Sequence, residues 1–356
     1  MKKRLLWELC LLLPFYVNMA HGQEIIHIVH IGDSHLQSGY MSAAIRKELA
    51  KERPLAGLGL ITPYRLAGTN APEYYQITSN VRWRACKISY NKCCDNTPPG
   101  GICIACQGGK YTFHIRSKST PFDQIVVFRG NETPPLTTKG ATLRLGEEVV
   151  SGFVSDTILL PRLVSSISLH PNKPTSQKAL YGNFLLTNNL ILKGFLYSPI
   201  ALNGAMYATY DQPDFINAFS RLNPDLVVIS LGTNEILAKR FRKDTFKSEV
   251  DHFIRSIKSK LSPQSRILLV SPPPTLLKNG QVNPNTRLVR EALAEEAREL
   301  RIDYFDLYQA MEQDQKATER YKAGNFFAFD RIHFSIHGYQ VMGAYVGHAI
   351  AALLNQ

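Results

Sequence analysis

Two hydrophobic patterns alternate along the first and the last parts of the chain. Short apolar runs, which are typical of buried strands, are each followed by a segment with apolar residues at helical spacing. Strands are expected at residues 25–31, 225–231, 266–271 and 302–306, and helices at residues 36–51, 211–222, 244–261, 285–300 and 337–353. Strands that alternate with helices favour a parallel sheet with helices on both faces, so the predicted fold class is α/β.

The middle of the chain has a different pattern. Its hydrophobic segments are short, rich in β-branched and aromatic residues, and separated by clusters of Pro, Gly, Asn and Thr; examples are residues 111–115, 124–128, 141–145 and 166–170. Several short strands with turn signals between them predict a β-sandwich or barrel. We therefore expect an inserted all-β domain at residues 55–190, within a discontinuous α/β domain of residues 23–54 plus 191–356.

Residues 1–22 have the pattern of a secretory signal peptide. The positive residues 2–4 precede an apolar stretch at residues 5–17, and the small residues Ala20 and Gly22 suit a signal peptidase. The apolar stretch is too short to span a membrane comfortably, and no later segment reaches spanning length. We expect an exported protein of the periplasm, the cell envelope or the exterior, without a transmembrane anchor.

The chain is basic, with a formal net charge of +12 over 356 residues. Such a charge suits an anionic partner. However, the positive residues are spread along the chain and no nucleic-acid motif is present, so nucleic acid is not an expected partner. Hydrophobic residues make up 44% and charged residues 20% of the chain, which is ordinary for a globular protein with a full core.

Of the six cysteines, all but one follow the expected signal peptide and crowd into one Pro- and Gly-rich region: Cys86, Cys93, Cys94, Cys103 and Cys106. Cys103 and Cys106, together with Cys93 or Cys94, would suit a zinc ion bound by thiolates. The alternative is a pair of disulfides that leaves one thiol over. Export favours the disulfides, whose pairing the sequence does not give.

Polar residues follow the predicted strands of the α/β domain at the points where these strands end. The set consists of Ser34, of Asn203-Gly204-Ala205, of Gly232-Thr233-Asn234-Glu235, and of Asp330 and His333 before the last helix. Each group alone is also typical of a helix N-cap, a turn or a surface ion pair. Because the carboxyl ends of parallel strands share the edge at which such sheets bind ligands, the groups together predict an active site.

These groups resemble the signature blocks of the SGNH (GDSL-like) hydrolases. The blocks are Gly32-Asp33-Ser34-His35, Asn203-Gly204-Ala205, Gly232-Thr233-Asn234-Glu235, and Asp330-Arg331-Ile332-His333 with the trailing Gly338-Tyr339. The Gly-Asp-Ser-His block with a β-rich insertion after it is similar to bacterial peptidoglycan O-acetylesterases. This resemblance implies a flavodoxin-like three-layer α/β/α fold and an inserted jelly-roll-like domain that resembles carbohydrate-binding modules.

The resemblance and the residue types imply a serine esterase. Ser34 would attack the ester, His333 would take its proton, and Asp330 would orient the imidazole. The Ser34 N–H, the Gly204 N–H and the Asn234 amide would form the oxyanion hole. Supporting roles are expected for Gly32, Asp33, His35, Gly232, Thr233 and Glu235. No metal and no cofactor is expected.

The expected substrate is an O-acetylated glycan, in the first place the N-acetylmuramic acid of peptidoglycan, which would react through an acetyl-Ser34 intermediate. An O-acetyltransferase would use the same triad, and an esterase for another acetylated polysaccharide, sialic acid or lipid is a further alternative. A non-catalytic carbohydrate-binding protein is the alternative from a different class, disfavoured because all the catalytic residue types are present. The sequence does not indicate the oligomeric state.

Overall fold

The computed structural model describes residues 24–89, 96–174, 176–314, 319 and 326–355. The expected signal peptide at residues 1–22, Cys93 and Cys94 lie outside the described residues. The described strands form one parallel sheet and two antiparallel sheets. Within this part of the chain, no helix combines the length and the apolar character that crossing a membrane requires.

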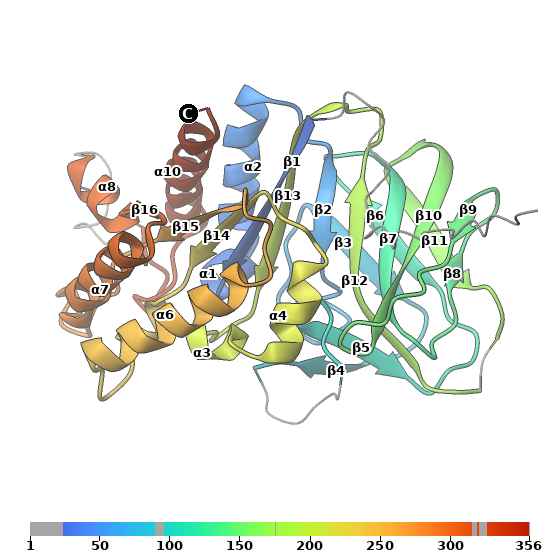
Figure 1. Cartoon of the computed structure of the whole chain (residues 1–356), viewed down its shortest axis with the longest axis horizontal. Helices are drawn as coiled ribbons and strands as arrows, with labels where there is room; N and C mark the ends of the chain where they lie inside the picture. Colours follow the sequence, from blue (N-terminus) through green and yellow to red (C-terminus); the bar gives the residue numbers. More distant parts are fainter. Residues whose placement is uncertain (1–23, 90–95, 175, 315–318, 320–325, 356) are drawn as a thin grey trace, which may run out of the picture.

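A five-stranded parallel sheet forms the centre of the α/β part (Figure 1). Its strand order is β13-β1-β14-β15-β16, which confirms the predicted fold class. The strands are β1 (Glu24–Gly32), β13 (Lys193–Ala201), β14 (Leu226–Ser230), β15 (Arg266–Val270) and β16 (Asp303–Phe305). The chain moves from β1 to β13 on one side and then to β14 on the other. The strand order therefore reverses at β1, and such sheets bind ligands at the carboxyl ends of the strands at this point.

Helices cover both faces of this sheet (Figure 1). On one face α10 packs against α2, and on the other α6 packs against α7. The helices are α1 (Ser34–Gln37), α2 (Tyr40–Glu52), α3 (Tyr207–Tyr210), α4 (Pro213–Ser220), α5 (Thr233–Ile236), α6 (Lys243–Lys258), α7 (Asn285–Leu300), α8 (Leu307–Gln313) and α10 (Ile336–Leu354). The predictions of α6, α7 and α10 were correct to within three residues at each end.

Alternate side chains of the parallel strands belong to two separate hydrophobic clusters. Ile28 and Val228 pack with α2 and α10, whereas Val29 and Val227 pack with α6 and α7. All of these side chains are fully buried. Because both faces of the sheet are covered, its strands are rich in apolar residues, and this property made them recognisable in the sequence. In β1, however, His27 and His30 are buried among the apolar side chains.

The residues between α2 and β13 form the two antiparallel sheets. One has the order β4-β5-β12-β7-β10-β9, with β2 also paired to β12, and the other has the order β3-β6-β11-β8. The strands are β2 (Gly57–Ile61), β3 (Tyr75–Ser79), β4 (Arg84–Lys87), β5 (Ile102–Cys106), β6 (Phe113–Ser117), β7 (Phe122–Gly130), β8 (Leu136–Thr137), β9 (Thr142–Arg144), β10 (Phe153–Val164), β11 (Ser166–Pro171) and β12 (Ala179–Thr187). The β-rich middle of the chain is therefore present. Its definition as a separate domain of residues 55–190 stays a prediction.

The core of the antiparallel region is continuous with that of the α/β part. A single hydrophobic cluster contains Ile229 of β14, Leu60 of β2 and Phe184 of β12. The connecting element is β2, which pairs with β12 and packs against β13. This shared packing holds the β-rich region in a fixed position beside the parallel sheet.

Two helix predictions need correction. The single helix expected at residues 36–51 is divided into α1 and α2 by Gly39, which has a left-handed φ of +85°. A Cβ at Gly39 would lie 2.6 Å from Pro72, so only glycine fits. The prediction was wrong because a break of so few residues leaves the helical spacing of the apolar residues almost unchanged. The helix expected at residues 211–222 is shorter, since α4 begins only at Pro213, a residue favoured in the first helical turn.

The cysteine-rich region is described in part. Cys86 forms a disulfide bond, and Cys103 lies opposite it in the register of β4 and β5. Cys106 carries a free thiol, whose pKa is raised by burial. Among the described residues, no group of three or more His, Cys, Asp or Glu side chains is arranged to hold a metal ion. Because Cys93 and Cys94 lie outside these residues, the pairing of two disulfides stays a prediction.

Candidate active site

Ser34 lies where β1 ends and α1 begins. Gly32 is the last residue of β1, and Asp33 is the N-cap of α1, where its carboxylate accepts the backbone N–H of His35 at 2.9 Å. Ser34 is therefore the first residue of the helix, and the first N–H of a helix has no partner within it. The hydroxyl and the N–H of Ser34 both lie at the carboxyl edge of the parallel sheet.

Three side chains predicted from the sequence form one continuous hydrogen-bonded chain. His333 Nε2 lies 2.8 Å from Ser34 Oγ, although 299 positions separate the two residues in sequence. His333 Nδ1 lies 2.6 Å from Asp330 Oδ2. The other carboxylate oxygen of Asp330 accepts the backbone N–H groups of Ile332 at 3.0 Å and of His333 at 2.9 Å. This arrangement has the geometry of a nucleophile, a base and an orienting carboxylate.

The Asp330–His333 pair is only half-buried, with side-chain exposures of 47% for Asp330 and 39% for His333. Partial burial raises the pKa of Asp330, but hydrogen bonds from the His333 ring and from the backbone of His333 and Ile332 outweigh it, so the pKa lies below its usual value. Asp330 is therefore ionised at neutral pH. An ionised carboxylate at Nδ1 fixes the ring tautomer that leaves Nε2 able to accept the serine proton.

The loop that carries the pair is held by contacts with a neighbouring loop. Arg331 has a left-handed φ of +59°, and its guanidinium donates to the backbone oxygen of Lys278 at 2.6 Å. Its own backbone oxygen accepts the N–H of Leu276 at 3.0 Å. Within the loop, the N–H of Ala328 donates to the oxygen of His333 at 2.8 Å. The positions of Asp330 and His333 thus depend on the segment that follows β15, which the sequence did not reveal.

Gly204 and Asn234 lie after β13 and β14, respectively. Gly204 has a left-handed φ of +75°, and a Cβ there would meet no atom within 4 Å, so this segment borders open space. The amide of Asn234 donates to the oxygen of Ala205 at 2.8 Å. Its nitrogen also lies 3.5 Å from Asp33 Oδ2, too far for a strong bond. The second N–H of the amide is thus only weakly engaged and can serve another acceptor.

Two acidic side chains of the predicted set are buried behind the serine. Asp33 is 1% and Glu235 is 5% exposed. Burial raises the pKa of each to about 7, although Asp33 accepts a hydrogen bond from the Thr233 side chain and Glu235 accepts the backbone N–H of Tyr207 at 2.9 Å. Gly232 is the N-cap of α5, which brings Thr233 to this position. These residues connect the turns on which Ser34 and Asn234 lie.

His35 is buried beside the pair and has structural contacts. Its Nδ1 lies 3.2 Å from the hydroxyl of Tyr339, and its ring meets that of Phe334 edge to face. Burial lowers the pKa of His35 to about 3, so the ring is neutral. His35 therefore packs the loop of Phe334 and the first turn of α10 against α1.

The sequence analysis missed a polar network that joins the inserted region to the site. Gln37 is the last residue of α1 and is buried; its carbonyl accepts the backbone N–H of Asn203 at 2.8 Å. Its amide donates to Asn70 Oδ1 at 2.8 Å and to Thr69 Oγ1 at 3.0 Å. Asn70 Oδ1 also accepts the side-chain amide of Asn203 at 2.7 Å. The loop after β2 thereby helps to position the segment that contains Gly204.

The chain is similar to known proteins in sequence and in fold. Residues 177–341 match the sequence model of the GDSL-like Lipase/Acylhydrolase family. A comparison with curated protein sequences gives no match. A solved structure described as a peptidoglycan O-acetylesterase in action is 20% identical, over 93% of this chain and 92% of its own, with a TM-score of 0.75. The two proteins share their fold over nearly the whole of both chains, including the β-rich region.

Two further solved structures cover less than half of this chain. The lipase/acylhydrolase from Enterococcus faecalis is 21% identical over 45% of this chain and 77% of its own, with a TM-score of 0.34. An acetyl xylan esterase is 17% identical over 44% of this chain and 81% of its own, with a TM-score of 0.37. This chain is thus similar to the GDSL-like lipases and acylhydrolases in the sequence of residues 177–341, and it shares the fold of the peptidoglycan O-acetylesterase structure.

Proposed function

We propose that this chain is an exported serine esterase that removes O-acetyl groups from a glycan, in the first place from O-acetylated peptidoglycan. The observation that carries the proposal is the unbroken chain of contacts from Asp330 through His333 to Ser34, with the two distances of 2.6 and 2.8 Å. A Ser hydroxyl is a poor nucleophile at neutral pH and needs such a base. The arrangement requires no group other than protein side chains for ester cleavage.

In the first half of the reaction, Ser34 Oγ attacks the carbonyl carbon of the acetyl ester. His333 Nε2 takes the hydroxyl proton, and the ionised Asp330 stabilises the imidazolium that results. The tetrahedral intermediate then collapses, the C–O bond to the sugar breaks, and His333 returns the proton to the departing sugar oxygen. The products of this half are a free glycan hydroxyl and an acetyl-Ser34 ester.

The negative oxygen of the intermediate would be stabilised by three donors: the N–H of Ser34, the N–H of Gly204 and the weakly engaged N–H of the Asn234 amide. These donors come from the carboxyl ends of three neighbouring strands, β1, β13 and β14. Their fixed positions mean that little reorganisation is needed as charge develops. In the second half, His333 activates water, which releases acetate and regenerates Ser34.

Four observations support a glycan of the bacterial wall as the substrate. The similar structure with a shared fold over both parts is described as a peptidoglycan O-acetylesterase. The β-rich region offers a surface beside the α/β part on which a polymer could be held, and its loop after β2 contacts the site through Asn70. The net charge of +12 would favour an anionic wall polymer. The export pattern of residues 1–22 agrees with this location.

The test is acetate release from purified O-acetylated peptidoglycan by the mature chain. Ser34→Ala should abolish release, and the matched control Ser259→Ala, an exposed residue at the end of α6, should leave it unchanged. No release by the wild type together with Ser34-dependent hydrolysis of 4-nitrophenyl acetate would keep the esterase and remove peptidoglycan as substrate. Acetylation of an added sugar acceptor faster than release of acetate would instead indicate a transferase.

A further inference from the structure

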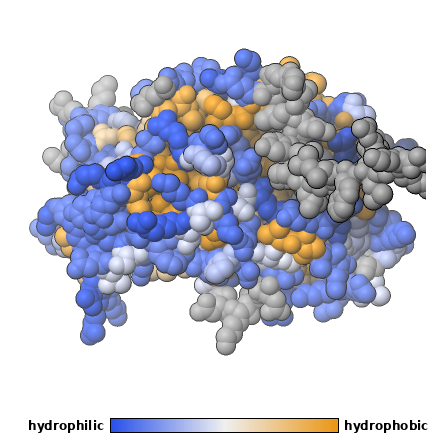
Figure 2. Space-filling view, in the orientation of Figure 1, coloured by the Kyte–Doolittle hydropathy of each residue, from blue (hydrophilic) through white to orange (hydrophobic). Residues whose placement is uncertain are grey.

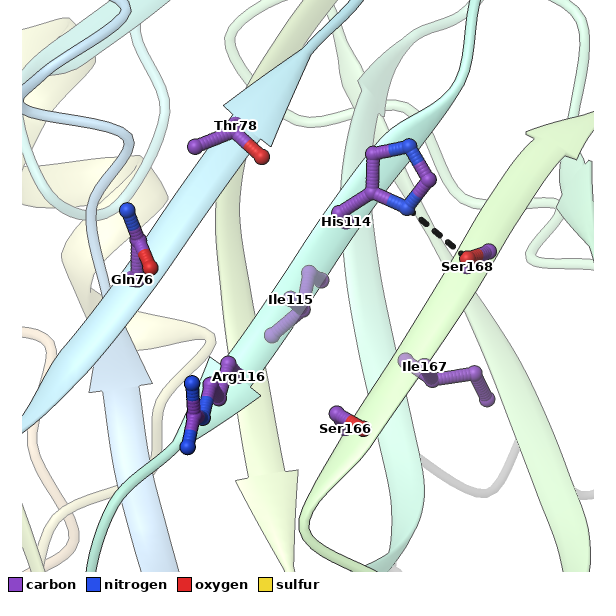
Figure 3. Close-up of a pocket in the computed structure, with 8 residues that line it drawn as sticks. All are labelled: Gln76, Thr78, His114, Ile115, Arg116, Ser166, Ile167 and Ser168. Carbon is purple, nitrogen blue, oxygen red and sulfur yellow. Dashed lines mark hydrogen bonds between the residues drawn. The ribbon is translucent and has the colours of Figure 1, made fainter.

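A hollow lies on the sheet β3-β6-β11-β8, and none of the residues of the catalytic site lines it. Figure 3 shows this groove, whose volume is about 360 Å³; it is lined by Gln76, Thr78, His114, Ile115, Arg116, Ser166, Ile167 and Ser168. This volume lies within the range of small-molecule sites in proteins. The groove is therefore large enough for a saccharide unit.

Strand register explains why the polar side chains of the groove share one face. Gln76 and Ser166 lie opposite Arg116 on its two neighbouring strands, and Thr78 and Ser168 lie opposite His114 in the same way. The intervening isoleucines point to the other face, where Ile77 and Ile115 are buried in the core. Side chains that lie opposite one another on adjacent strands are about 5 Å apart. These polar side chains therefore form two rows across three strands, and this surface is called the platform below.

The polar groups of this platform are neutral or basic. It offers a guanidinium, an imidazole, an amide and three hydroxyl groups, whereas no acidic side chain among the described residues lines the groove. The exposed guanidinium of Arg116 thus has no carboxylate partner within the groove. One ring nitrogen of His114 is held by Ser168 Oγ at 2.8 Å, as Figure 3 shows, which orients the imidazole and leaves the other nitrogen for a ligand.

These groups favour some classes of ligand over others. Apolar surface from Ile115 and Ile167 lies between the polar groups, so the groove suits a ligand with both polar groups and C–H faces, and a cation would be repelled by Arg116. A carboxylate matches the planar fork of a guanidinium with paired hydrogen bonds. Hydroxyl groups of a sugar match the amide of Gln76 and the hydroxyls of Thr78, Ser166 and Ser168, which both donate and accept. A saccharide that carries a carboxylate satisfies both sets.

We propose that the groove between β3, β6 and β11 is a binding site for a carboxylate-bearing saccharide, separate from the catalytic serine. Arg116 binds the carboxylate, and the surrounding polar side chains bind the sugar hydroxyls. That the saccharide belongs to the esterase substrate rests on the proposed function. The existence of the site does not, because binding is measured without turnover.

The test uses the mature chain with Ser34→Ala, which binds without cleaving. Its probes are purified peptidoglycan sacculi, soluble polygalacturonate and a neutral β-glucan, and the readout is the dissociation constant or the fraction of protein that sediments with the polymer. Arg116→Gln should weaken binding to the carboxylated polymers about tenfold or more. Arg144→Gln removes the same charge from an exposed position on β9 and should change binding less than about twofold.

Binding of sacculi alone would assign the site to carboxylates of peptidoglycan, and binding of both acidic polymers would assign it to acidic saccharides in general. Equal effects of Arg116→Gln and Arg144→Gln, or equal affinity for the neutral glucan, would overturn the proposal. A circular dichroism spectrum and a urea unfolding midpoint of Arg116→Gln equal to those of the parent protein would show that the variant is folded. Groove-dependent binding without any acetate release from peptidoglycan would retain this site while refuting the proposed function.

Discussion

Glu235 accepts the backbone N–H of Tyr207 at 2.9 Å and thereby joins the turn after β14 to the turn after β13. The first turn carries Asn234 and the second carries Gly204, so one buried carboxyl group fixes the distance between two proposed oxyanion donors. The other oxygen of Glu235 is buried without a hydrogen-bond partner among the described residues. Because burial of an unpartnered oxygen is costly, we expect the hydrogen bond to Tyr207 to position Asn234 and Gly204.

Replacement of Glu235 should therefore lower the rate of the chemical step. Glu235→Ala removes the connection, and a displaced donor group typically costs between about tenfold and a hundredfold in kcat. Glu235→Gln retains an acceptor for the Tyr207 N–H and should keep kcat within about threefold of the wild type. The measurement is kcat and KM for a small acetate ester. Equal losses in the two variants, or a loss confined to KM, would argue against a positioning role.

The same residue should make stability depend on pH. Burial raises the pKa of Glu235 to about 7, whereas a glutamate in an unfolded chain titrates near about 4.3. Between these values the folded state holds a proton that the unfolded state releases, so the free energy of unfolding falls as pH rises from about 4 to about 7 and is then constant. The full effect is about 4 kcal/mol at most. Asp33, whose pKa burial also raises to about 7, acts in the same direction.

Urea unfolding at pH 5 and at pH 8 would measure this dependence. Glu235→Gln cannot titrate, so its loss of stability between the two pH values should be smaller than that of the wild type by about 1–3 kcal/mol. Glu132→Gln, at an exposed turn, is the matched control and should behave as the wild type. A Glu235→Gln variant with an undiminished pH dependence would mean that Glu235 is already ionised at pH 5 in the folded protein.

Asp330→Asn should show whether Asp330 orients the base His333 or only stabilises the fold. The asparagine oxygen can still accept the backbone N–H groups of Ile332 and His333, so stability should change by less than about 1 kcal/mol. The ionised partner of His333 is lost, however, and kcat should fall about 10³–10⁴-fold with little change in KM. Steady-state kinetics on 4-nitrophenyl acetate checks the prediction. A loss below about tenfold would show that Asp330 is only a loop-stabilising residue.

Part of this arrangement could be predicted from the sequence, for a physical reason. The strands of the parallel sheet are buried on both faces and are therefore rich in apolar residues, so β1 and β14 were located within two residues. Because the carboxyl ends of such strands share one edge, Ser34 and Asn234 were expected close together. The contact of His333 with Ser34 followed from the same rule together with the family resemblance. The catalytic roles of these residues stay predictions.

Other features depend on neighbours that are distant in sequence. Gly39 divides α1 from α2 because Pro72 approaches it, and nothing in the local helical pattern contains Pro72. Gln37 was expected only as a helical residue, yet its amide holds Asn70 of the inserted region against Asn203. Such contacts join separate segments through side chains of ordinary polar type. They become visible only when the fold has brought these segments together.

The last prediction concerns Asn234 and its dependence on Glu235. Asn234→Ala removes one proposed oxyanion donor, and such a loss typically lowers kcat about 10²–10³-fold while KM changes little. If Glu235 acts by positioning the donors, Glu235→Ala should cost far less in the Asn234→Ala background than in the wild type, since one of the donors it positions is already absent. The double variant should therefore lose less than the product of the two single losses, the remaining effect being the displacement of Gly204, as kcat for all three variants on the same ester would show. If the loss of kcat in the double variant equals the product of the two single losses, the two residues act independently. The bond between Glu235 and Tyr207 would then have no part in stabilising the intermediate through Asn234.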